Sequence, residues 1–206
     1  SSDDTVCVAD RHGADVLRHP YTKGNGASVK TGIRDAKTDF IVLMDADSQH
    51  DPADIPNLMT RLLSGYDMVI GARGWSSQAS ISRGLANLLY NCLASWMVGH
   101  RVSDLTSGFR AVRRKRFVQF LHMLPNGFSY PATSTIAFFR AGYSVAFEPI
   151  VAHPRQGRTS HIRPLKDGLR FLLIIFKIGT LYSPLKVFAP LSLVFFLLGS
   201  GYYGYT

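Results

Sequence analysis

The stretch FIVLMDADSQHDPAD, residues 40–54, predicts both the centre of the fold and the site built on it. It starts with an unbroken apolar run from Phe40 to Met44. This run is too short to cross a membrane and is rich in β-forming residues, so it predicts a strand buried on both faces, as in the parallel sheets of α/β proteins. Asp45 and Asp47 follow at the carboxyl end of that strand, the edge where open α/β sheets bind ligands.

Asp45 and Asp47 form a candidate metal site. A single residue separates them, so in extended backbone their side chains point to the same side. Crowded carboxylates repel unless a cation lies between them, and hard oxygen ligands suit Mg²⁺ or Mn²⁺, with Gln49 as a candidate third ligand. The alternative is a solvated turn that caps the next helix, which is the expectation for Asp51 and Pro52. The apolar strand before the pair and the polar residues after it favour the metal site.

The composition limits the fold and the partners. The chain has 206 residues, 46% of them hydrophobic, which predicts one α/β domain plus a smaller element. A formal net charge of +9 calls for an anionic partner: nucleic acid, acidic lipid or a phosphorylated substrate. Nucleic acid is not expected, because the basic run Arg113 to Arg116 would wrap around a helix and no RNA-binding aromatic signature accompanies it. Cys7 and Cys92 lack metal-ligand spacing and are expected to be reduced, buried thiols.

The segment DADSQHDP, residues 45–52, resembles the metal-binding motif of the family 2 glycosyltransferases with a GT-A fold. The resemblance is to the polyprenyl-phosphate hexosyltransferases that are similar to dolichyl-phosphate mannose synthase, and it covers nearly the whole chain. It implies an α/β fold with a mainly parallel, Rossmann-like sheet flanked by helices. The expected domains are a catalytic domain over residues 1–164, an amphipathic juxtamembrane segment over 165–186 and a transmembrane helix over 187–206.

The first residues resemble the end of an acidic segment of that family. Relatives open with a strand, a PxYNE-like segment and a second strand that runs into a DDGS-type stretch, which Ser1 to Thr5 resembles. The resemblance therefore gives Asp3 and Asp4 a donor-binding role. It also implies that the strands holding the nucleotide base are missing, so the fragment by itself is expected to be inactive.

The rest of the first quarter predicts a βαβ unit. Residues 14–17 predict a short strand, a glycine-rich turn with Lys23 and Gly24 follows, and residues 28–36 predict a helix that leads to the strand at 40–44. Strand, helix and strand in this order force a parallel pairing. The resemblance places the turn beside the nucleotide sugar, so Lys23 and Gly24 are candidate donor-binding residues.

Two helices and a strand follow the acidic motif. Residues 55–63 predict a helix whose buried face carries Leu58, Leu62 and Leu63. Residues 66–70 predict a strand beside the metal-site strand. A longer helix over 82–97 carries apolar residues at helical spacing, which predicts a core face formed by Leu85, Leu88, Leu89, Cys92, Leu93, Trp96 and Met97.

Four residues are candidates for an acceptor phosphate site. Arg73 follows the strand at 66–70 and should face the same cleft as the metal site, which favours phosphate contact over a solvated cation. Arg83 lies in the first turn of a helix, where the partial positive charge favours a bound anion. The resemblance assigns both arginines to the lipid phosphate, and Asn87 and Ser107 are assigned to the same site.

Two later segments also match the family. Asp104 begins a D-x-x-S-G-F segment and is a candidate general base or the cap of a turn ended by Gly108. The basic loop at 153–161 resembles the R-x-x-G-x-S-K loop that folds over the donor diphosphate. In that register the candidate donor-binding residues are Arg155, Arg158, Ser160 and His161. Since the glycine is shifted and histidine stands where lysine is usual, the choice between Arg155 and Arg158 as the phosphate clamp stays open.

The C-terminal segment predicts membrane attachment. Residues 165–186 alternate basic with apolar residues, as in a helix on a membrane surface. The 20 residues from Val187 to Thr206 carry no charge and would be about 30 Å long as a helix, enough to span the hydrocarbon core. Basic residues before the span place the catalytic domain in the cytoplasm.

These patterns together predict an enzyme that transfers a hexose from a nucleotide diphosphate sugar to a polyprenyl phosphate. Asp45, Asp47 and Gln49 would hold the divalent ion, with Asp47 and Asp104 catalytic, and the resemblance implies inversion at the anomeric carbon. One alternative is a processive family 2 polysaccharide synthase, although the sequence has no Q-x-x-R-W motif. Another is a catalytically silent membrane scaffold that binds anionic lipid through its basic loops.

Overall fold

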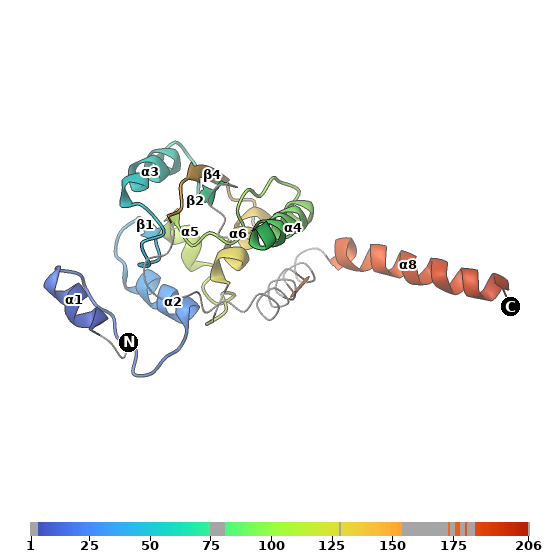
Figure 1. Cartoon of the computed structure of the whole chain (residues 1–206), viewed down its shortest axis with the longest axis horizontal. Helices are drawn as coiled ribbons and strands as arrows, with labels where there is room; N and C mark the ends of the chain where they lie inside the picture. Colours follow the sequence, from blue (N-terminus) through green and yellow to red (C-terminus); the bar gives the residue numbers. More distant parts are fainter. Residues whose placement is uncertain are drawn as a thin grey trace.

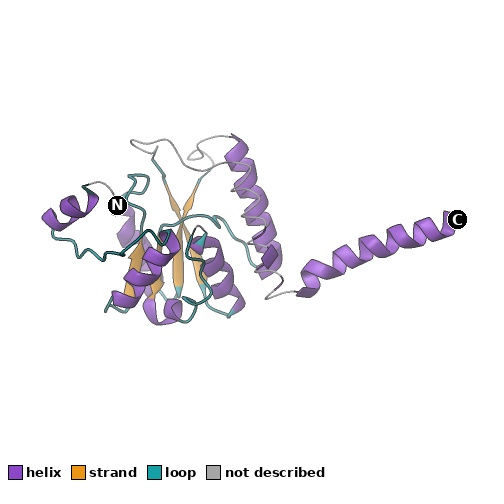
Figure 2. Ribbon diagram, turned by 90° about the horizontal axis from the view of Figure 1, so that it is seen from below, coloured by secondary structure: helices purple, strands orange, loops and turns teal. Residues whose placement is uncertain are grey.

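The computed structural model describes residues 4–74, 81–127, 129–153, 173, 176–177, 180 and 184–205. Its centre is a mixed four-stranded sheet with helices on both faces (Figure 1, Figure 2). The strands are β1 (Phe40–Leu43), β2 (Met68–Arg73), β3 (Arg110–Arg113) and β4 (Val145–Ile150). Their order across the sheet is β1-β3-β2-β4.

Strand β3 lies between β1 and β2 and runs antiparallel to both. Its register pairs Phe40 with Arg113 on one side and Met68 with Val112 on the other. Strands β2 and β4 are parallel. As a result, β1 and β2 point the same way without being neighbours, and their carboxyl ends reach the same edge as the amino end of β3.

Four expectations about the strands are wrong. Residues 14–17 form no strand, and most of this run, which Asp15 interrupts, is exposed, so it supplies no partner for a βαβ unit. Strand β1 is half-buried and not buried on both faces, because among the described strands it pairs with β3 alone. The expected pairing of β1 with the strand at 66–70 fails because β3 occupies the place between them, and the described sheet is mixed and not mainly parallel.

Helix α3 (Ile55–Leu63) covers one face of the sheet. It follows a short 3-10 turn, Pro52–Asp54, in which the Asp51 side chain accepts a hydrogen bond from the Ala53 N–H at 2.9 Å, as expected for a capping residue. Leu58 and Leu62 are fully buried against β2 and β3. The prediction that Leu63 shares this face is wrong, since Leu63 is 59% exposed.

Three helices cover the opposite face: α2 (Asn25–Asp35), α5 (Arg114–Val118) and α6 (Tyr130–Arg140). Ile33, Phe117 and Phe138 from these helices pack on Met68 and other residues of the sheet. The basic run at the start of α5 is partly structural, because the guanidinium of Arg114 donates to the Ile33 carbonyl at 3.0 Å. This hydrogen bond and the burial of Ile33 therefore fix α2 against α5 and the sheet.

Helix α4 (Ile81–Val98) packs beside α6, and its orientation contradicts the predicted core face. The side that meets α6 is formed by Tyr90, Ala94, Met97 and Val98. Of the residues predicted to be buried, only Met97 is, and Leu93 is half-buried. The others are exposed: Leu85, Leu88, Leu89, Cys92 and Trp96.

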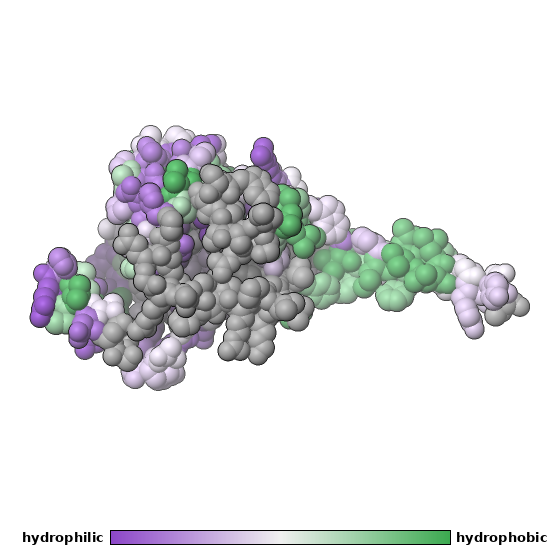
Figure 3. Space-filling model, viewed as in Figure 1, coloured by the Kyte–Doolittle hydropathy of each residue, from purple (hydrophilic) through white to green (hydrophobic). Residues whose placement is uncertain are grey.

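The terminal helices stand apart from the sheet. Helix α1 (Thr5–Arg11) buries no residue, and both Cys7 and Cys92 are exposed, so the expectation of buried thiols is wrong. Helix α8 (Pro184–Tyr205) projects away from the sheet (Figure 1), and hydrophobic side chains cover much of it (Figure 3). Within the described residues it is the one helix long and apolar enough to cross a membrane, as the sequence predicts for this end of the chain.

Candidate active site

Three segments meet at one edge of the sheet. The acidic turn with Asp45 and Asp47 leaves β1 there, and Arg73 ends β2. The loop from Asp104 to Phe109 enters β3 from the same edge, because β3 runs antiparallel to its two neighbours. The antiparallel strand therefore adds a third functional segment to an edge that two parallel strands already supply.

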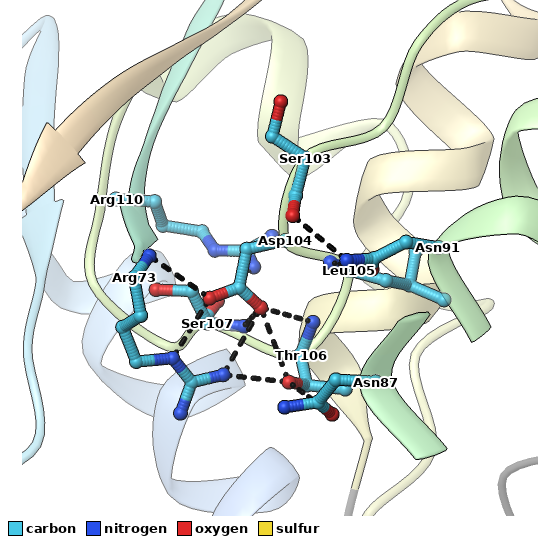
Figure 4. Close-up of polar contacts among 9 residues, drawn as sticks. All are labelled: Arg73, Asn87, Asn91, Ser103, Asp104, Leu105, Thr106, Ser107 and Arg110. Atoms are coloured by element: carbon cyan, nitrogen blue, oxygen red, sulfur yellow. Dashed lines mark hydrogen bonds and ion pairs between the residues drawn. The ribbon is translucent and has the colours of Figure 1, made fainter. Parts of the chain in front are cut away.

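Arg73 and Asp104 form a buried bidentate ion pair (Figure 4). The Arg73 Nε lies 2.7 Å from Asp104 Oδ2, and its Nη2 lies 3.0 Å from Oδ1. The Asp104 side chain is 4% exposed and that of Arg73 is 24% exposed. Nη2 also donates to the Thr106 hydroxyl at 2.6 Å. Parallel N–H donors on one carboxylate fix the guanidinium plane as well as its position.

Asp104 accepts backbone hydrogen bonds in addition to the Arg73 side chain. Its carboxylate accepts from the N–H groups of Arg73 at 3.2 Å, Thr106 at 3.1 Å and Ser107 at 3.1 Å. Burial alone raises the pKa of Asp104, but the hydrogen bonds and charge of Arg73, with the backbone N–H groups, outweigh it and hold that pKa below its ordinary value. The geometry favours the cap predicted for Asp104 over a general base, because its oxygens are already committed to donors.

Helix α4 holds this loop through two asparagines. Asn91 donates to the Ser103 carbonyl at 2.7 Å and accepts from the Leu105 N–H at 2.9 Å. The Thr106 hydroxyl lies 3.5 Å from Asn87 Oδ1. The Arg73 guanidinium donates to the same Thr106 hydroxyl. Asn87 and Arg73, both predicted for the acceptor site, therefore contact one residue (Figure 4).

Gly108 makes room for Asp45. A Cβ atom at Gly108 would lie 2.9 Å from Asp45 Oδ2 and 3.3 Å from the Tyr130 hydroxyl. That hydroxyl donates to the Gly108 carbonyl at 3.2 Å, which holds the loop against α6. The Asp45 carboxylate therefore packs on bare backbone, and any side chain at position 108 would displace it.

The turn after Asp45 brings further polar groups to this edge. Asp47 Oδ1 accepts from the Gln49 N–H at 3.2 Å, and the Gln49 carbonyl accepts from the His153 N–H at 2.9 Å. His50 stacks on Phe109 with ring centroids 5.0 Å apart, and its buried Nδ1 has no hydrogen-bond partner among the described residues. Burial lowers the pKa of His50, and the charge of Arg73 adds to this effect, while Asp45 opposes it.

Asp45 and Asp47 supply the oxygen atoms that could bind a divalent cation at this edge. The described His, Cys, Asp and Glu residues contain no group of three or more that could hold a metal ion. Asp45 and Asp47 offer two carboxylates from one turn, and hard oxygen donors of this kind suit an ion that takes its remaining ligands from phosphates and water. The two carboxylates together with a substrate diphosphate would therefore fit Mg²⁺ or Mn²⁺. The described side chains alone do not supply enough ligands for such an ion.

Arg110 is a buried residue of the site that the sequence did not suggest. It is fully buried at the start of β3, and its guanidinium donates to the Ser107 and Pro131 carbonyls and to the hydroxyls of Ser134 and Thr135. Burial lowers its pKa to about 10, against the opposing charges of Tyr130, Asp104 and Asp45. Arg110 therefore ties the Asp104 loop to α6. Its only signal in the sequence is its place directly after the matched D-x-x-S-G-F segment.

Other predicted residues lie elsewhere or outside the described part. Lys23 lies with its ammonium 5.3 Å from the Tyr21 ring centroid. At the start of α2, after Gly24, the Gly26 and Ala27 N–H groups donate to the 126–127 carbonyls at 3.0 and 2.9 Å, so they do not face a phosphate. Asp4 precedes α1 and makes no capping hydrogen bond with its side chain. Ser107 is fully buried, and it shapes the loop through its N–H. Predictions outside the described residues concern Asp3, Arg155, Arg158, Ser160, His161 and the Arg83 side chain.

Two family models match the chain. The model described as "Glycosyl transferase family 2" matches residues 1–120, and the model described as "GtrB C-terminal hairpin" matches residues 183–206. The first covers more than half of the chain and includes the acidic turn, Arg73 and the Asp104 loop. The second coincides with α8.

Individual relatives agree with these models. The chain is 31% identical over 173 residues to an uncharacterized glycosyltransferase from Mycobacterium tuberculosis, covering 79% of this chain and 74% of the relative. It is 29% identical over 171 residues to a dolichyl-phosphate hexose transferase from Haloferax volcanii, covering 82% and 73%. Among solved structures, it resembles glucosyl-3-phosphoglycerate synthase from Mycobacterium tuberculosis in complex with Mn²⁺, uridine diphosphate and phosphoglyceric acid, with a TM-score of 0.67 and 21% identity. That match covers 87% of this chain and 64% of the solved one.

Proposed function

This chain belongs to glycosyl transferase family 2, and on that premise we propose that it transfers a hexose from a nucleotide diphosphate sugar to a polyprenyl phosphate. The GT-A fold expected from the sequence agrees with the solved neighbours. The acceptor class is supported by the relative named as a dolichyl-phosphate hexose transferase, and attachment to a membrane by α8 and the C-terminal hairpin match.

The observation that carries this proposal is the placement of Arg73 at the edge that also carries Asp45 and Asp47. Among the described residues the Arg73 Nη1 has no hydrogen-bond partner, while Nε and Nη2 are held by Asp104 and Thr106. A guanidinium fixed on one side and free on the other is suited to receive a phosphate oxygen. The carboxylates of Asp45 and Asp47 and the guanidinium of Arg73 thus reach the same edge of the sheet, which supports a metal-bound donor beside an anionic acceptor.

The residues divide the work of a reaction between two anions. Asp45 and Asp47 would hold a divalent ion, which neutralises charge on the departing diphosphate. Arg73 would orient the acceptor phosphate and offset its repulsion from the donor, with Asn87 beside it. The acceptor phosphate has a second pKa of about 6 and is mostly ionised at neutral pH, so no strong base is needed to remove a proton from it. We therefore give Asp104 a positioning role through Arg73, in place of proton abstraction.

The decisive experiment compares Asp47→Ala with Asp51→Ala. Both remove a carboxylate from the same turn, but Asp51 only caps the 3-10 turn before α3. The full chain in detergent is supplied with labelled UDP-hexoses or GDP-hexoses, undecaprenyl phosphate and Mn²⁺, with EDTA as the metal-free arm. We expect Asp47→Ala to abolish metal-dependent transfer and Asp51→Ala to retain most of it.

A second measurement keeps the test valid if the chain needs upstream residues to turn over. Isothermal titration of each nucleotide sugar with and without Mn²⁺ should show metal-linked binding heat that Asp47→Ala removes. Equal activity or equal metal-linked heat in both variants would refute the metal assignment. If metal-linked nucleotide heat is absent even after the chain is extended by the base-binding strands with which relatives open, the silent membrane scaffold is supported instead.

A further inference from the structure

The outward face of helix α4 is apolar along almost its whole length. The side chains on this face, which we call the α4 stripe, are exposed to 57%, 48%, 50% and 51% at Leu85, Leu88, Leu89 and Trp96, and Cys92 is exposed among them. Their spacing of three, four or seven residues puts them on one side of the helix. The side that meets α6 lies opposite and is buried.

A helix with two apolar faces is unusual at a water-exposed surface. From residue 84 to residue 98 the sequence contains no Asp, Glu, Lys or Arg. A surface helix of a soluble domain carries charged or polar residues on its outward face, and an exposed apolar patch of this kind marks an interaction surface. The α4 stripe therefore calls for an apolar partner.

The position of the stripe relative to α8 indicates which partner. The Lys186 ammonium in the first turn of α8 donates to the Trp96 carbonyl at 3.1 Å and to the Met97 carbonyl at 3.3 Å. The last turn of α4 is thus bound to the start of the helix that is long and apolar enough to cross a membrane. Trp96 stands at that junction, and tryptophan is enriched at membrane–water interfaces because its ring has an apolar body and a polar N–H.

We propose that the α4 stripe lies in the interfacial layer of the lipid bilayer, with phospholipid acyl chains packed against its leucines. The Lys186 hydrogen bonds join the last turn of α4 to the first turn of α8, so the stripe adjoins the helix that is long and apolar enough to cross a membrane. The absence of charge along α4 is then expected, because charged side chains there would have to be dehydrated. The contact does not depend on the reaction assigned above.

The same contact would fix the height of the site above the bilayer. Asn87 lies on α4 between stripe residues, facing the Asp104 loop, and it approaches the Thr106 hydroxyl that supports Arg73. With α4 in the interfacial layer, the guanidinium of Arg73 would lie near the depth at which lipid phosphates are found. A substrate whose phosphate is anchored by a lipid tail could then reach the site without leaving the membrane.

The two native cysteines provide a matched experiment. Cys92 lies in the stripe and Cys7 lies on α1, and both are exposed. The full chain is prepared as Cys7→Ser and as Cys92→Ser, each is labelled with a nitroxide at the remaining thiol, and each is reconstituted into vesicles of phosphatidylethanolamine and phosphatidylglycerol. Electron paramagnetic resonance then measures collisions with oxygen, which concentrates in acyl chains, and with a water-soluble nickel chelate.

We expect the label at Cys92 to collide more with oxygen than with the chelate, and the label at Cys7 to show the reverse. Chelate collisions at Cys92 equal to those at Cys7 would mean that the stripe faces water, and the proposal would be wrong. Protection of Cys92 from both reagents would also overturn it, because the stripe would then be covered by protein. In that case the measurement is repeated with the protein highly diluted in the vesicles. Protection that disappears on dilution would mean that a second copy covers the stripe, and protection that persists would mean that another segment of the same chain covers it.

Discussion

Replacement of Asp104 by asparagine removes the anion that holds Arg73 at the site. The asparagine amide keeps the size of the carboxylate but loses its charge, and its NH₂ group would face donors of Arg73 or of the loop. Removal of one partner from a buried ion pair costs about 3–5 kcal/mol, because the other charge is left uncompensated. Since the Arg73 side chain retains 24% exposure, we expect the loss of unfolding free energy to be at the lower end, about 3 kcal/mol.

The assay is urea unfolding of the full chain in detergent micelles, followed by circular dichroism. The matched control is Glu148→Gln, which breaks the ion pair between Arg61 and Glu148. That pair has a similar N–O distance, 2.8 Å against 2.7 Å, but the Arg61 side chain is 41% exposed. Its loss should therefore be below about 1 kcal/mol, as for surface pairs. Equal losses in the two variants would refute the reasoning from burial.

Combination with Arg73→Met separates the pair from its surroundings. If Asp104 acts through Arg73, the double variant should lose less stability than the sum of the two single variants, with a coupling energy of about 2 kcal/mol. Transfer activity should fall to a similar level in all three. Loss of activity in Asp104→Asn with normal stability and no coupling to Arg73 would instead identify Asp104 as a general base.

Three further predictions use glycines and pH. Gly26→Ala places a Cβ against the carbonyls of the 125–127 loop and should cost about 3 kcal/mol, whereas Gly32→Ala in the same helix meets nothing within 4 Å and should stabilise by about 0.5–1 kcal/mol in urea unfolding. Gly108→Ala should weaken Mn²⁺ binding measured by calorimetry, because the new Cβ would lie 2.9 Å from Asp45 Oδ2; unchanged binding would contradict this. Folding lowers the pKa of Asp104 below its ordinary value of 3.8. The stabilisation that ionised Asp104 gives the folded state is therefore present above pH 3.8 and is lost as the pH falls through the folded-state pKa. The difference in unfolding free energy between the unmodified protein and Asp104→Asn should accordingly shrink between neutral pH and a pH of about 3.

Local patterns predicted the elements that depend on period and capping. The helices at α2, α3 and α4 and the strands β1 and β2 lie close to the predicted positions, since apolar periodicity and flanking glycines mark them. Strand β3 could not be predicted in the same way. It has only four residues, Arg110–Arg113, with arginine at both ends, and it is a strand because two neighbours supply its hydrogen bonds.

The orientation of α4 shows a different limit. Its sequence has apolar residues on two sides, and periodicity does not tell which side meets protein. The structure buries the side with Tyr90 and Ala94 and exposes the leucines. A prediction that assumes water as the only surroundings chooses the larger side chains as the core, and for α4 these are the exposed leucines and Trp96.

The candidate site was predictable where a short motif carried it. The acidic turn, Arg73 and Asp104 came from motifs that adjoin strands, and the structure places them at one edge. The contacts inside the site were not predictable, because they join segments far apart in the sequence, as Arg73 and Asp104 do. Arg110 was missed for a related reason: a buried cation that donates to carbonyls and hydroxyls of distant segments has no local pattern in the sequence.

The position of β3 has a consequence for synthesis of the protein. Strands β1 (residues 40–43) and β2 (residues 68–73) leave the ribosome well before β3 (residues 110–113). In the described sheet, β3 is the strand that joins β1 to β2. Until then, among the described strands, a gap separates β1 from β2, and long-range closure of this kind is slow. The gap is filled by β3, which follows the loop that begins at Asp104, so the edge that carries the candidate site should take shape only when the sheet becomes continuous.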